Sequence, residues 1–276
     1  MTATCPIPLR SKILSTLGIE SCHVIHAPTD RPEISYRVNV FESLKEAKAT
    51  LIKAVKERLA TKTNSSFRGL VYCRKKEDVD EIAKMIGCDA FHADRPEDER
   101  KNSFKNWVDG KGKIMVCSSL LGCGIDVEGV TMVFHFGTPW SILDFVQESG
   151  RAGRGGKASM SVVYAAKDER APEEDGVDLY GKVTMREWVL QNSTCRRVAL
   201  SSFLDDGRTT CTLLKGAVPC DVCIAESAKP HPGKLVSFSR MAIPAGDAPK
   251  AIKLPTIPPS SFDFALSRIP PVEHIQ

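Results

Sequence analysis

Between residues 41 and 165, short apolar runs alternate with segments whose apolar residues recur at helical spacing. The apolar runs have the length and the residue types of buried strands. The helical segments carry charged residues between their apolar positions, as helices packed on a sheet do. This alternation predicts an α/β fold, with a mostly parallel sheet covered by helices on both faces. The predicted strands are residues 69–73, 88–92, 113–118, 130–136 and 158–165, and the predicted helices lie within 41–60, around 79–86, after Pro96 and after Ser141.

The size and composition of the chain are those of an ordinary globular protein. Its 276 residues are enough for one α/β domain and a smaller appendage. The formal charge of +4 permits a nucleic-acid partner but does not argue for one. No apolar run reaches the roughly 18 residues of a membrane helix, and residues 1–10 contain no signal-peptide core. We therefore expect an intracellular protein with no membrane partner.

Composition changes twice along the chain. Residues 167–176 (KDERAPEEDG) are strongly charged and predict a boundary after residue 166. Residues 183–204 return to helical periodicity, which places Cys195 on a helix. From residue 226 onward, little periodicity remains and nine of the 17 prolines occur. The predicted parts are an α/β domain over residues 1–166, a small, mainly helical, cysteine-bearing subdomain over 167–225 and a disordered Pro-rich tail over 226–276.

The most informative stretch is rich in glycine and arginine: residues 147–155 read QESGRAGRG. Arg151 and Arg154 are three residues apart and share a side if the backbone makes one helical turn. Guanidinium groups are planar, permanently charged and suited to bidentate contact with phosphate oxygens. The alternatives are a solvated basic turn or a flexible segment that binds RNA nonspecifically. The position between a predicted helix and a predicted strand disfavours the flexible segment.

The longer segment at residues 147–156 (QESGRAGRGG) resembles motif VI of superfamily 2 helicases in its RecQ form. Other segments resemble further motifs of that family in the family's order. They are residues 2–4 (motif III), 30–32 (the Arg-Pro element of the second domain), 70–87 (motif IV), 90–104 (the adjoining His-containing motif) and 117–154 (motif V to motif VI). The resemblance covers about residues 2–225 and implies the second, RecA-like lobe of a helicase.

The resemblance also implies roles for single residues. Arg154 would be the arginine finger, which stabilises the charge of phosphoryl transfer, and Arg151 would be a second contact to the γ-phosphate. Asp94 departs from the family's Gly, and its charge would weaken contact with phosphates. Without the family, Asp126 would be an ordinary turn residue and His92 a structural histidine. The remaining implied contacts are Gln147, Gly124 and Asp126 to the nucleotide, and Ser118, Ser119, Arg74 and His92 to nucleic acid.

A helicase also needs a P-loop, Gly-x-x-x-x-Gly-Lys-Ser/Thr, to hold the phosphates and Mg²⁺. The near match at residues 176–183 (GVDLYGKV) lacks the metal-binding hydroxyl at Val183 and carries Asp178, which would repel phosphate. The sequence has no Asp-Glu box either. We therefore expect ATP with Mg²⁺ to be shared with an N-terminal RecA-like lobe, in cis or in trans, and the chain to be inactive alone.

Three hypotheses for function follow. The first is the C-terminal part of an ATP-dependent 3′–5′ DNA helicase of the RecQ type, which acts on single-stranded or junction-containing DNA and is nuclear if the organism is a eukaryote. The second is a non-enzymatic nucleic-acid- or partner-binding module derived from a helicase lobe, which the missing P-loop favours. The third and weakest hypothesis is an RNA helicase of the DEAD-box type, since motif VI of that family usually begins with His where this chain has Gln147.

Four of the ten cysteines lie close together late in the chain. Cys211 follows Cys195 after 15 residues, Cys220 follows after eight more, and Cys223 completes a Cys-x-x-Cys. Four thiolates can form a tetrahedral Zn²⁺ site. The alternative is buried free thiols, which pack as small hydrophobes, but the adjacent Thr, Pro and Asp residues are poor core neighbours. The stretch also resembles the RecQ zinc-binding subdomain, with a longer gap between Cys211 and Cys220.

Overall fold

The computed structural model describes residues 4–20, 22–61, 67–119, 127–170 and 176–228. Residues up to Pro230 form one compact unit. The predicted division after residue 166 stays a prediction. The predicted Pro-rich tail lies outside the described residues from residue 229 onward. No helix of the described part is long and apolar enough to cross a membrane.

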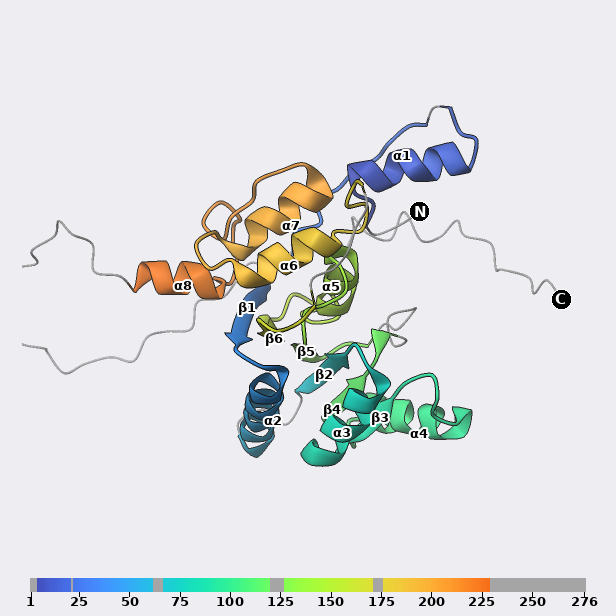
Figure 1. The fold of residues 1–276 in the computed structure, drawn as a ribbon, viewed down its shortest axis with the longest axis vertical. Helices are drawn as coiled ribbons and strands as arrows, with labels where there is room; N and C mark the ends of the chain where they lie inside the picture. The colour runs from blue at the N-terminus through green and yellow to red at the C-terminus, as the bar shows by residue number, and fades with distance from the viewer. Residues whose placement is uncertain (1–3, 21, 62–66, 120–126, 171–175, 229–276) are drawn as a thin grey trace, which may run out of the picture. The chain divides into compact units, whose positions relative to one another are not determined.

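The centre of the unit is a six-stranded sheet. Its strands are β1 (Ile34–Phe41), β2 (Arg68–Cys73), β3 (Asp89–Phe91), β4 (Ile114–Cys117), β5 (Val130–Phe136) and β6 (Ser159–Ala166). They lie in the order β1-β6-β5-β2-β4-β3, and every neighbouring pair is parallel (Figure 1). All carboxyl ends therefore meet at one edge, where open α/β sheets bind their ligands.

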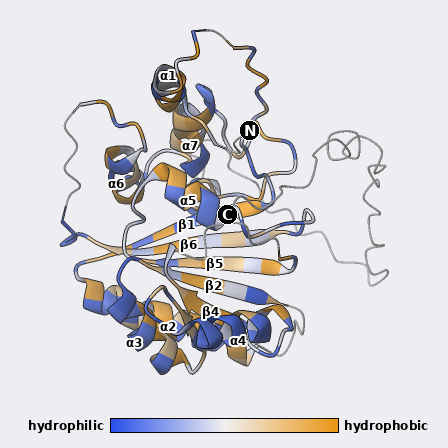
Figure 2. Ribbon diagram, turned by 90° about the vertical axis from the view of Figure 1, so that its right-hand side faces the viewer, coloured by the Kyte–Doolittle hydropathy of each residue, from blue (hydrophilic) through white to orange (hydrophobic). Residues whose placement is uncertain are grey.

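Helices cover both faces of this sheet, and each face has its own apolar core. The helices are α1 (Ile7–Thr16), α2 (Leu44–Ala60), α3 (Lys76–Ile86), α4 (Glu97–Val108), α5 (Ile142–Ser149), α6 (Lys182–Leu190), α7 (Arg196–Asp205) and α8 (Asp221–Ser227). Figure 2 shows α2 and α3 on the opposite side of the sheet from α5, α6 and α7. The predicted fold class is confirmed: a parallel α/β sheet followed by a small, mainly helical, cysteine-bearing part.

Local signals explain where several helices begin and end. At the start of α2 the Ser43 side chain accepts a hydrogen bond from the Glu46 N–H, and Ser141 accepts one from the Asp144 N–H at the start of α5. α3 ends at Gly87, which adopts the left-handed conformation with φ +82°. The observed elements confirm the strands and helices predicted over residues 41–165, with ends shifted by a few residues.

Residues 183–204, which the sequence predicts to be helical, form two helices, α6 and α7, with a break at residues 191–195. Between them, the Gln191 side-chain oxygen accepts hydrogen bonds from the N–H groups of Ser193 and Thr194. This side-chain turn ends α6 even though the apolar periodicity continues. Cys195 is therefore the residue that precedes α7, and its predicted place on a helix is wrong.

The predicted elements do not include α1, α8 or β1. The reason is clearest for β1, which lies at the edge of the sheet and pairs only with β6. Its first residues, Ile34 to Tyr36, are buried, whereas Arg37 is exposed and the remainder is half-buried or exposed. An edge strand keeps polar residues in water, so β1 lacks the continuous apolar run that reveals a central strand.

Candidate nucleotide, nucleic-acid and metal sites

The first candidate site is the turn between α5 and β6, here called the arginine loop (residues 150–156). Gly153 has a φ of +75°, and its N–H donates to the Val130 carbonyl at 3.0 Å. A Cβ atom at Gly153 would lie 2.6 Å from Cγ of Glu33. Only glycine therefore satisfies both the backbone conformation and the close approach of Glu33.

Arg31 holds the arginine loop from a distant part of the sequence. Its Nη1 donates to the Gly150 carbonyl at 2.8 Å, and its Nη2 donates to the Ala152 carbonyl at 2.9 Å. Its Nε pairs with Glu33 at 2.6 Å. The loop is thus fixed by both ends of one guanidinium group, which argues against a flexible Arg–Gly segment. Sequence reasoning missed this role because the partners of Arg31 are backbone carbonyls 119 and 121 residues away.

The two candidate arginines of the loop have different surroundings. Arg151 is 6% exposed and lies near the phenol of Tyr72. The pKa of Tyr72 is raised well above its ordinary value, mainly by burial, while the charge of Arg151 opposes that rise. Arg154 is half-buried and lies nearer the surface. Of the pair, Arg154 is better placed to reach a ligand that arrives from solvent.

A buried polar pair joins α5, the helix that precedes the arginine loop, to the sheet. Nε2 of His135, on β5, lies 3.1 Å from the Oε2 of Glu148, on α5. The His135 ring also stacks on Tyr72 with 5.5 Å between ring centroids. A buried hydrogen bond between helix and strand fixes how the helix sits. Gln147, the predicted nucleotide contact on α5, is exposed, whereas Gly124 and Asp126 lie outside the described residues.

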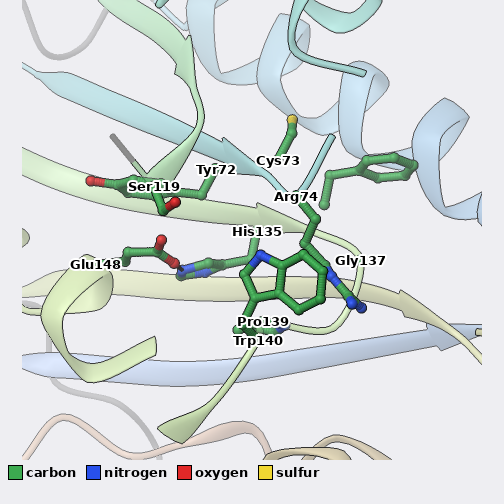
Figure 3. A pocket seen from close by; sticks show the side chains of 10 residues that line it. Tyr72, Cys73, Arg74, Ser119, His135, Gly137, Pro139, Trp140 and Glu148 are labelled. Atoms are coloured by element: carbon green, nitrogen blue, oxygen red, sulfur yellow. Dashed lines mark hydrogen bonds and ion pairs between the residues drawn. The ribbon is translucent and has the colours of Figure 1, made fainter. Parts of the chain in front are cut away.

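A second candidate site lies at the carboxyl ends of β2 and β5, where Figure 3 shows a pocket that Arg74, Ser119 and Trp140 line. The Arg74 guanidinium lies over the Trp140 ring, 3.6 Å from its centroid. The Nη1 of Arg74 is also 3.6 Å from the Oε2 of Glu169. The structure thus brings together the predicted residues Arg74 and Ser119. Sequence reasoning missed Trp140, whose signal is an aromatic residue in the polar loop before α5.

The other two residues predicted to contact nucleic acid, Ser118 and His92, differ in how exposed they are. Ser118 is half-buried at the end of β4, and its N–H donates to the Phe91 carbonyl at 3.1 Å. His92 is 4% exposed, and its Nε2 lies 3.1 Å from Asp80. This burial is typical of a structural histidine, so the contact of His92 with nucleic acid stays a prediction. Asp94 forms an ion pair with Lys76 at 2.6 Å.

The third candidate site is the cysteine cluster, formed by Cys195, Cys211, Cys220 and Cys223. Its four sulfur atoms all lie within 4.8 Å of one another. The Cys195 sulfur is 3.6 Å from that of Cys211 and 3.9 Å from that of Cys220. Four sulfurs at a Zn–S distance of about 2.3 Å would be about 3.8 Å apart in a tetrahedron. The spacing therefore fits a bound metal, and it is too long for a disulfide bond.

Hydrogen bonds around the cysteine cluster stabilise thiolate sulfur. The Arg196 N–H donates to the Cys220 sulfur at 3.5 Å, and the Cys220 N–H donates to the Cys211 sulfur at 3.3 Å. The hydrogen bond between the sulfur atoms of Cys195 and Cys220, 3.9 Å apart, lowers the pKa of Cys220 below its ordinary value. Since a metal binds the thiolate form, these donors prepare the cluster for a cation.

The P-loop near match at residues 176–183 has a different role in the structure. The Asp178 carboxylate accepts hydrogen bonds from the Lys182 N–H at 2.7 Å and from the Thr184 N–H at 2.9 Å. These are the N–H groups at the start of α6, where an anion would bind a helix. The carboxylate occupies that place, so the segment is a helix cap and not a phosphate cradle.

Residues 48–156 match the family model of the helicase conserved C-terminal domain. The chain contains a helicase C-terminal domain. This domain includes the arginine loop and the pocket of Arg74, Ser119 and Trp140, while the cysteine cluster follows it.

Relatives of this chain include ATP-dependent DNA helicases named Q1 and RecQ. The chain is 27% identical over 234 residues to the ATP-dependent DNA helicase Q1 of Caenorhabditis elegans, with 81% of this chain and 36% of the relative covered. It is 27% identical over 240 residues to the ATP-dependent DNA helicase RecQ of Pasteurella multocida, again with 81% and 36% covered. The chain therefore spans about a third of the length of these relatives.

Among solved structures, this chain is similar to the E. coli DEAD-box protein SrmB bound to RraA. The identity is 22%, the TM-score is 0.40, and the match covers 48% of this chain and 76% of that chain.

Proposed function

We propose that the chain is the second RecA-like lobe of an ATP-dependent 3′–5′ DNA helicase of the RecQ type. The observation that carries this proposal is the arginine loop, whose sequence resembles motif VI and which Arg31 holds through two backbone carbonyls. In the proposed reaction, ATP with Mg²⁺ is bound by an N-terminal RecA-like lobe, and the DNA is single-stranded or junction-containing. Arg154 is the proposed arginine finger, Arg151 contacts the γ-phosphate, and Gln147, Gly124 and Asp126 contact the nucleotide.

The geometry explains why a fixed loop suits this reaction. Closure of the two lobes would bring the Arg154 guanidinium to the γ-phosphate, where negative charge is stabilised during phosphoryl transfer. A donor that is already oriented loses little free energy in reorganising at that moment. The hydrogen bonds of Arg31 to Gly150 and Ala152 fix the backbone of the loop that carries Arg154. Repeated closing and opening of the cleft would move the lobe along one DNA strand, with Ser118, Ser119, Arg74 and His92 as proposed contacts to it.

We also propose that the cysteine cluster binds one Zn²⁺. The support is the set of four sulfur atoms, since thiolates select Zn²⁺ over hard cations such as Mg²⁺ and Ca²⁺. A closed shell of four protein ligands is the arrangement of a structural zinc site and leaves no position for a substrate. The proposed role of the metal is therefore to hold the part of the chain that follows the helicase C-terminal domain.

The test of the helicase proposal is Arg154→Ala in a protein that also carries a P-loop lobe. We expect turnover of ATP to fall by roughly 10³-fold, which is about 4 kcal/mol of transition-state stabilisation. The Kd for single-stranded DNA should stay nearly unchanged. Arg154→Lys should restore little, because an ammonium group lacks the planar fork of guanidinium. Unchanged kcat with weakened DNA binding would place the arginine loop on DNA and would overturn the proposal.

The second candidate function is a non-enzymatic module that binds nucleic acid or a partner protein. The observation that favours it is the Asp178 carboxylate at the start of α6, which leaves the P-loop near match unable to hold phosphate. Both functions predict that the chain alone does not hydrolyse ATP. They differ when a P-loop lobe from a RecQ helicase is added in trans, because only the helicase lobe should then stimulate ATP hydrolysis that depends on Arg154.

A further inference from the structure

The pocket at the carboxyl ends of β2 and β5 presents an aromatic ring that the proposed reaction does not use. Trp140 is 52% exposed, whereas the other two tryptophans, Trp107 and Trp188, are each 1% exposed. Trp140 lies between Pro139 and Ser141, the residue that caps α5. Its backbone is thus tied to the start of a helix, and the ring is presented to solvent from a fixed position (Figure 3).

One face of this ring is already occupied. The Arg74 guanidinium lies over it, 3.6 Å from the ring centroid, and is itself 3.6 Å from the Glu169 carboxylate. The Glu169 side chain is 5% exposed. It accepts hydrogen bonds from the Thr138 N–H at 2.9 Å and the Ala166 N–H at 2.9 Å. A buried carboxylate therefore fixes the guanidinium, and the guanidinium fixes the plane of the indole.

The surroundings of the ring favour one class of ligand. Arg74 supplies a positive charge beside the ring, and the next residue, Lys75, is exposed. Ser119 lines the same pocket and offers a hydroxyl. A flat aromatic face next to positive charge and hydroxyl groups fits a nucleotide unit, whose base stacks while its phosphate is attracted by the cations. Phe136 and Pro139 also line the pocket, but an apolar peptide would make no use of the charge of Arg74 or the hydroxyl of Ser119.

We propose that Trp140 is a base-stacking platform for single-stranded DNA, with Arg74 as the residue that positions its ring. This proposal rests on the proposed function, in which the chain binds DNA. It adds one contact, the stacking of a base on the indole ring of Trp140. Stacking on one aromatic side chain contributes about 1–3 kcal/mol per base and tolerates any sequence. The platform would therefore grip the strand without selecting its sequence, as an enzyme that moves along DNA requires.

The test uses the chain itself with oligo-dT, measured by fluorescence anisotropy of the labelled oligonucleotide and by intrinsic tryptophan fluorescence. Since Trp107 and Trp188 are buried, acrylamide and DNA should quench mainly Trp140. Trp140→Ala should raise the Kd by about 5- to 150-fold, the equivalent of 1–3 kcal/mol, with little change in its salt dependence. Trp140→Phe should keep most of the affinity while it removes the DNA-dependent quenching. Arg74→Lys should make Trp140 more accessible to acrylamide in the free chain and should weaken binding less than Trp140→Ala does.

The matched control is Tyr180→Ala, which removes an exposed aromatic side chain outside the pocket and should leave the Kd unchanged. Binding of oligo-dT that is equally strong in Trp140→Ala, without quenching in the unaltered chain, would overturn the platform and leave the DNA partner standing. Weaker binding by Trp140→Ala without DNA-dependent quenching in the unaltered chain would also overturn the platform, because the loss of affinity would then not come from a base stacked on Trp140. A chain that binds no oligo-dT would overturn the DNA partner and the platform together.

Discussion

The arginine loop and the cysteine cluster are both short irregular segments whose function needs a fixed geometry, but different interactions hold them. The arginine loop is held by neutral backbone carbonyls that accept from Arg31, and this clamp forms when the chain folds. The cysteine cluster presents four sulfur atoms to one another, and thiolates that close repel each other unless a cation lies between them. The clamp of the arginine loop is therefore complete in the folded polypeptide, whereas the cysteine cluster has the geometry of a site that a metal ion would complete.

A buried arginine connects the two regions. Arg197, two residues after Cys195, is 1% exposed. It donates to the Arg31 carbonyl at 2.9 Å and to the Ile34 carbonyl at 2.7 Å. The Val218 N–H, two residues before Cys220, donates to the Pro32 carbonyl at 2.8 Å. The backbone of Arg31, the residue that clamps the arginine loop, is therefore itself held by residues next to the cysteine cluster.

Removal of the metal should have the largest effect. Structural zinc contributes apparent free energies of about 10–16 kcal/mol in zinc-finger peptides. We expect one zinc per chain by elemental analysis, less in Cys223→Ser, and an unchanged content in the control Cys88→Ser. Hydrogen exchange of the metal-free chain should accelerate strongly over residues 195–227 and only moderately over 150–156, with α2 and α3 still protected. A metal-free chain that keeps full protection over residues 195–227 would show that the cluster needs no ligand.

Arg197→Met should have the next largest effect, because it removes the Arg197 donors from the carbonyls of Arg31 and Ile34. The Arg31 carbonyl keeps the Ile34 N–H as a donor. Loss of a hydrogen bond to a charged group or of a buried donor costs about 1–3 kcal/mol, so we expect the free energy of unfolding to fall by roughly 3 kcal/mol for the two bonds together. Chemical denaturation measures this change, and the exposed Arg208→Met is the control. Exchange should rise in both the arginine loop and the cysteine cluster. A rise in only one of them would show that Arg197 does not connect the two.

Arg31→Gln should affect the arginine loop alone. The substitution removes two donors to carbonyls and the partner of Glu33, and we expect a loss of roughly 2 kcal/mol. Exchange of the N–H groups over residues 150–156 should become faster, while the zinc content should stay the same because the contacts of Arg197 are to the backbone. Loss of zinc from this variant would contradict the prediction that the Arg31 side chain holds the arginine loop without affecting the cysteine cluster.

Glu148→Gln should have the smallest effect. An amide can still bond to His135, so we expect less than about 1 kcal/mol of lost stability, whereas Glu148→Ala should cost about 1–3 kcal/mol by leaving His135 unpaired. Thermal unfolding of the two variants side by side measures the difference. Equal losses would mean that the charge of Glu148, and not its hydrogen bond, fixes α5 on the sheet.

The central strands could be predicted because they are buried on both faces and are mostly apolar, as in Val130 to Phe136, where only Thr131 and His135 are polar. The edge strand β1 was not predicted, because its solvent-exposed residues are polar and interrupt the apolar run that marks a buried strand. The same contrast applies to the sites. The arginines of the loop and the four cysteines are visible as local patterns, since phosphate and metal binding need those residue types at short spacing. Arg31 and Arg197 form no such pattern, because they act on carbonyls far away in the chain.

The amino-acid sequence by itself determined the parallel α/β class, the family resemblance of the arginine loop and the set of four cysteines, because each is a regularity over neighbouring residues. Only the tertiary structure decided that Arg151 faces the interior, that Cys195 precedes a helix, and that Arg74 lies on Trp140. Those outcomes depend on which segments fold against each other. Hydrogen bonds such as that of Arg31 to Gly150 join residues more than a hundred positions apart, and no local spacing records them.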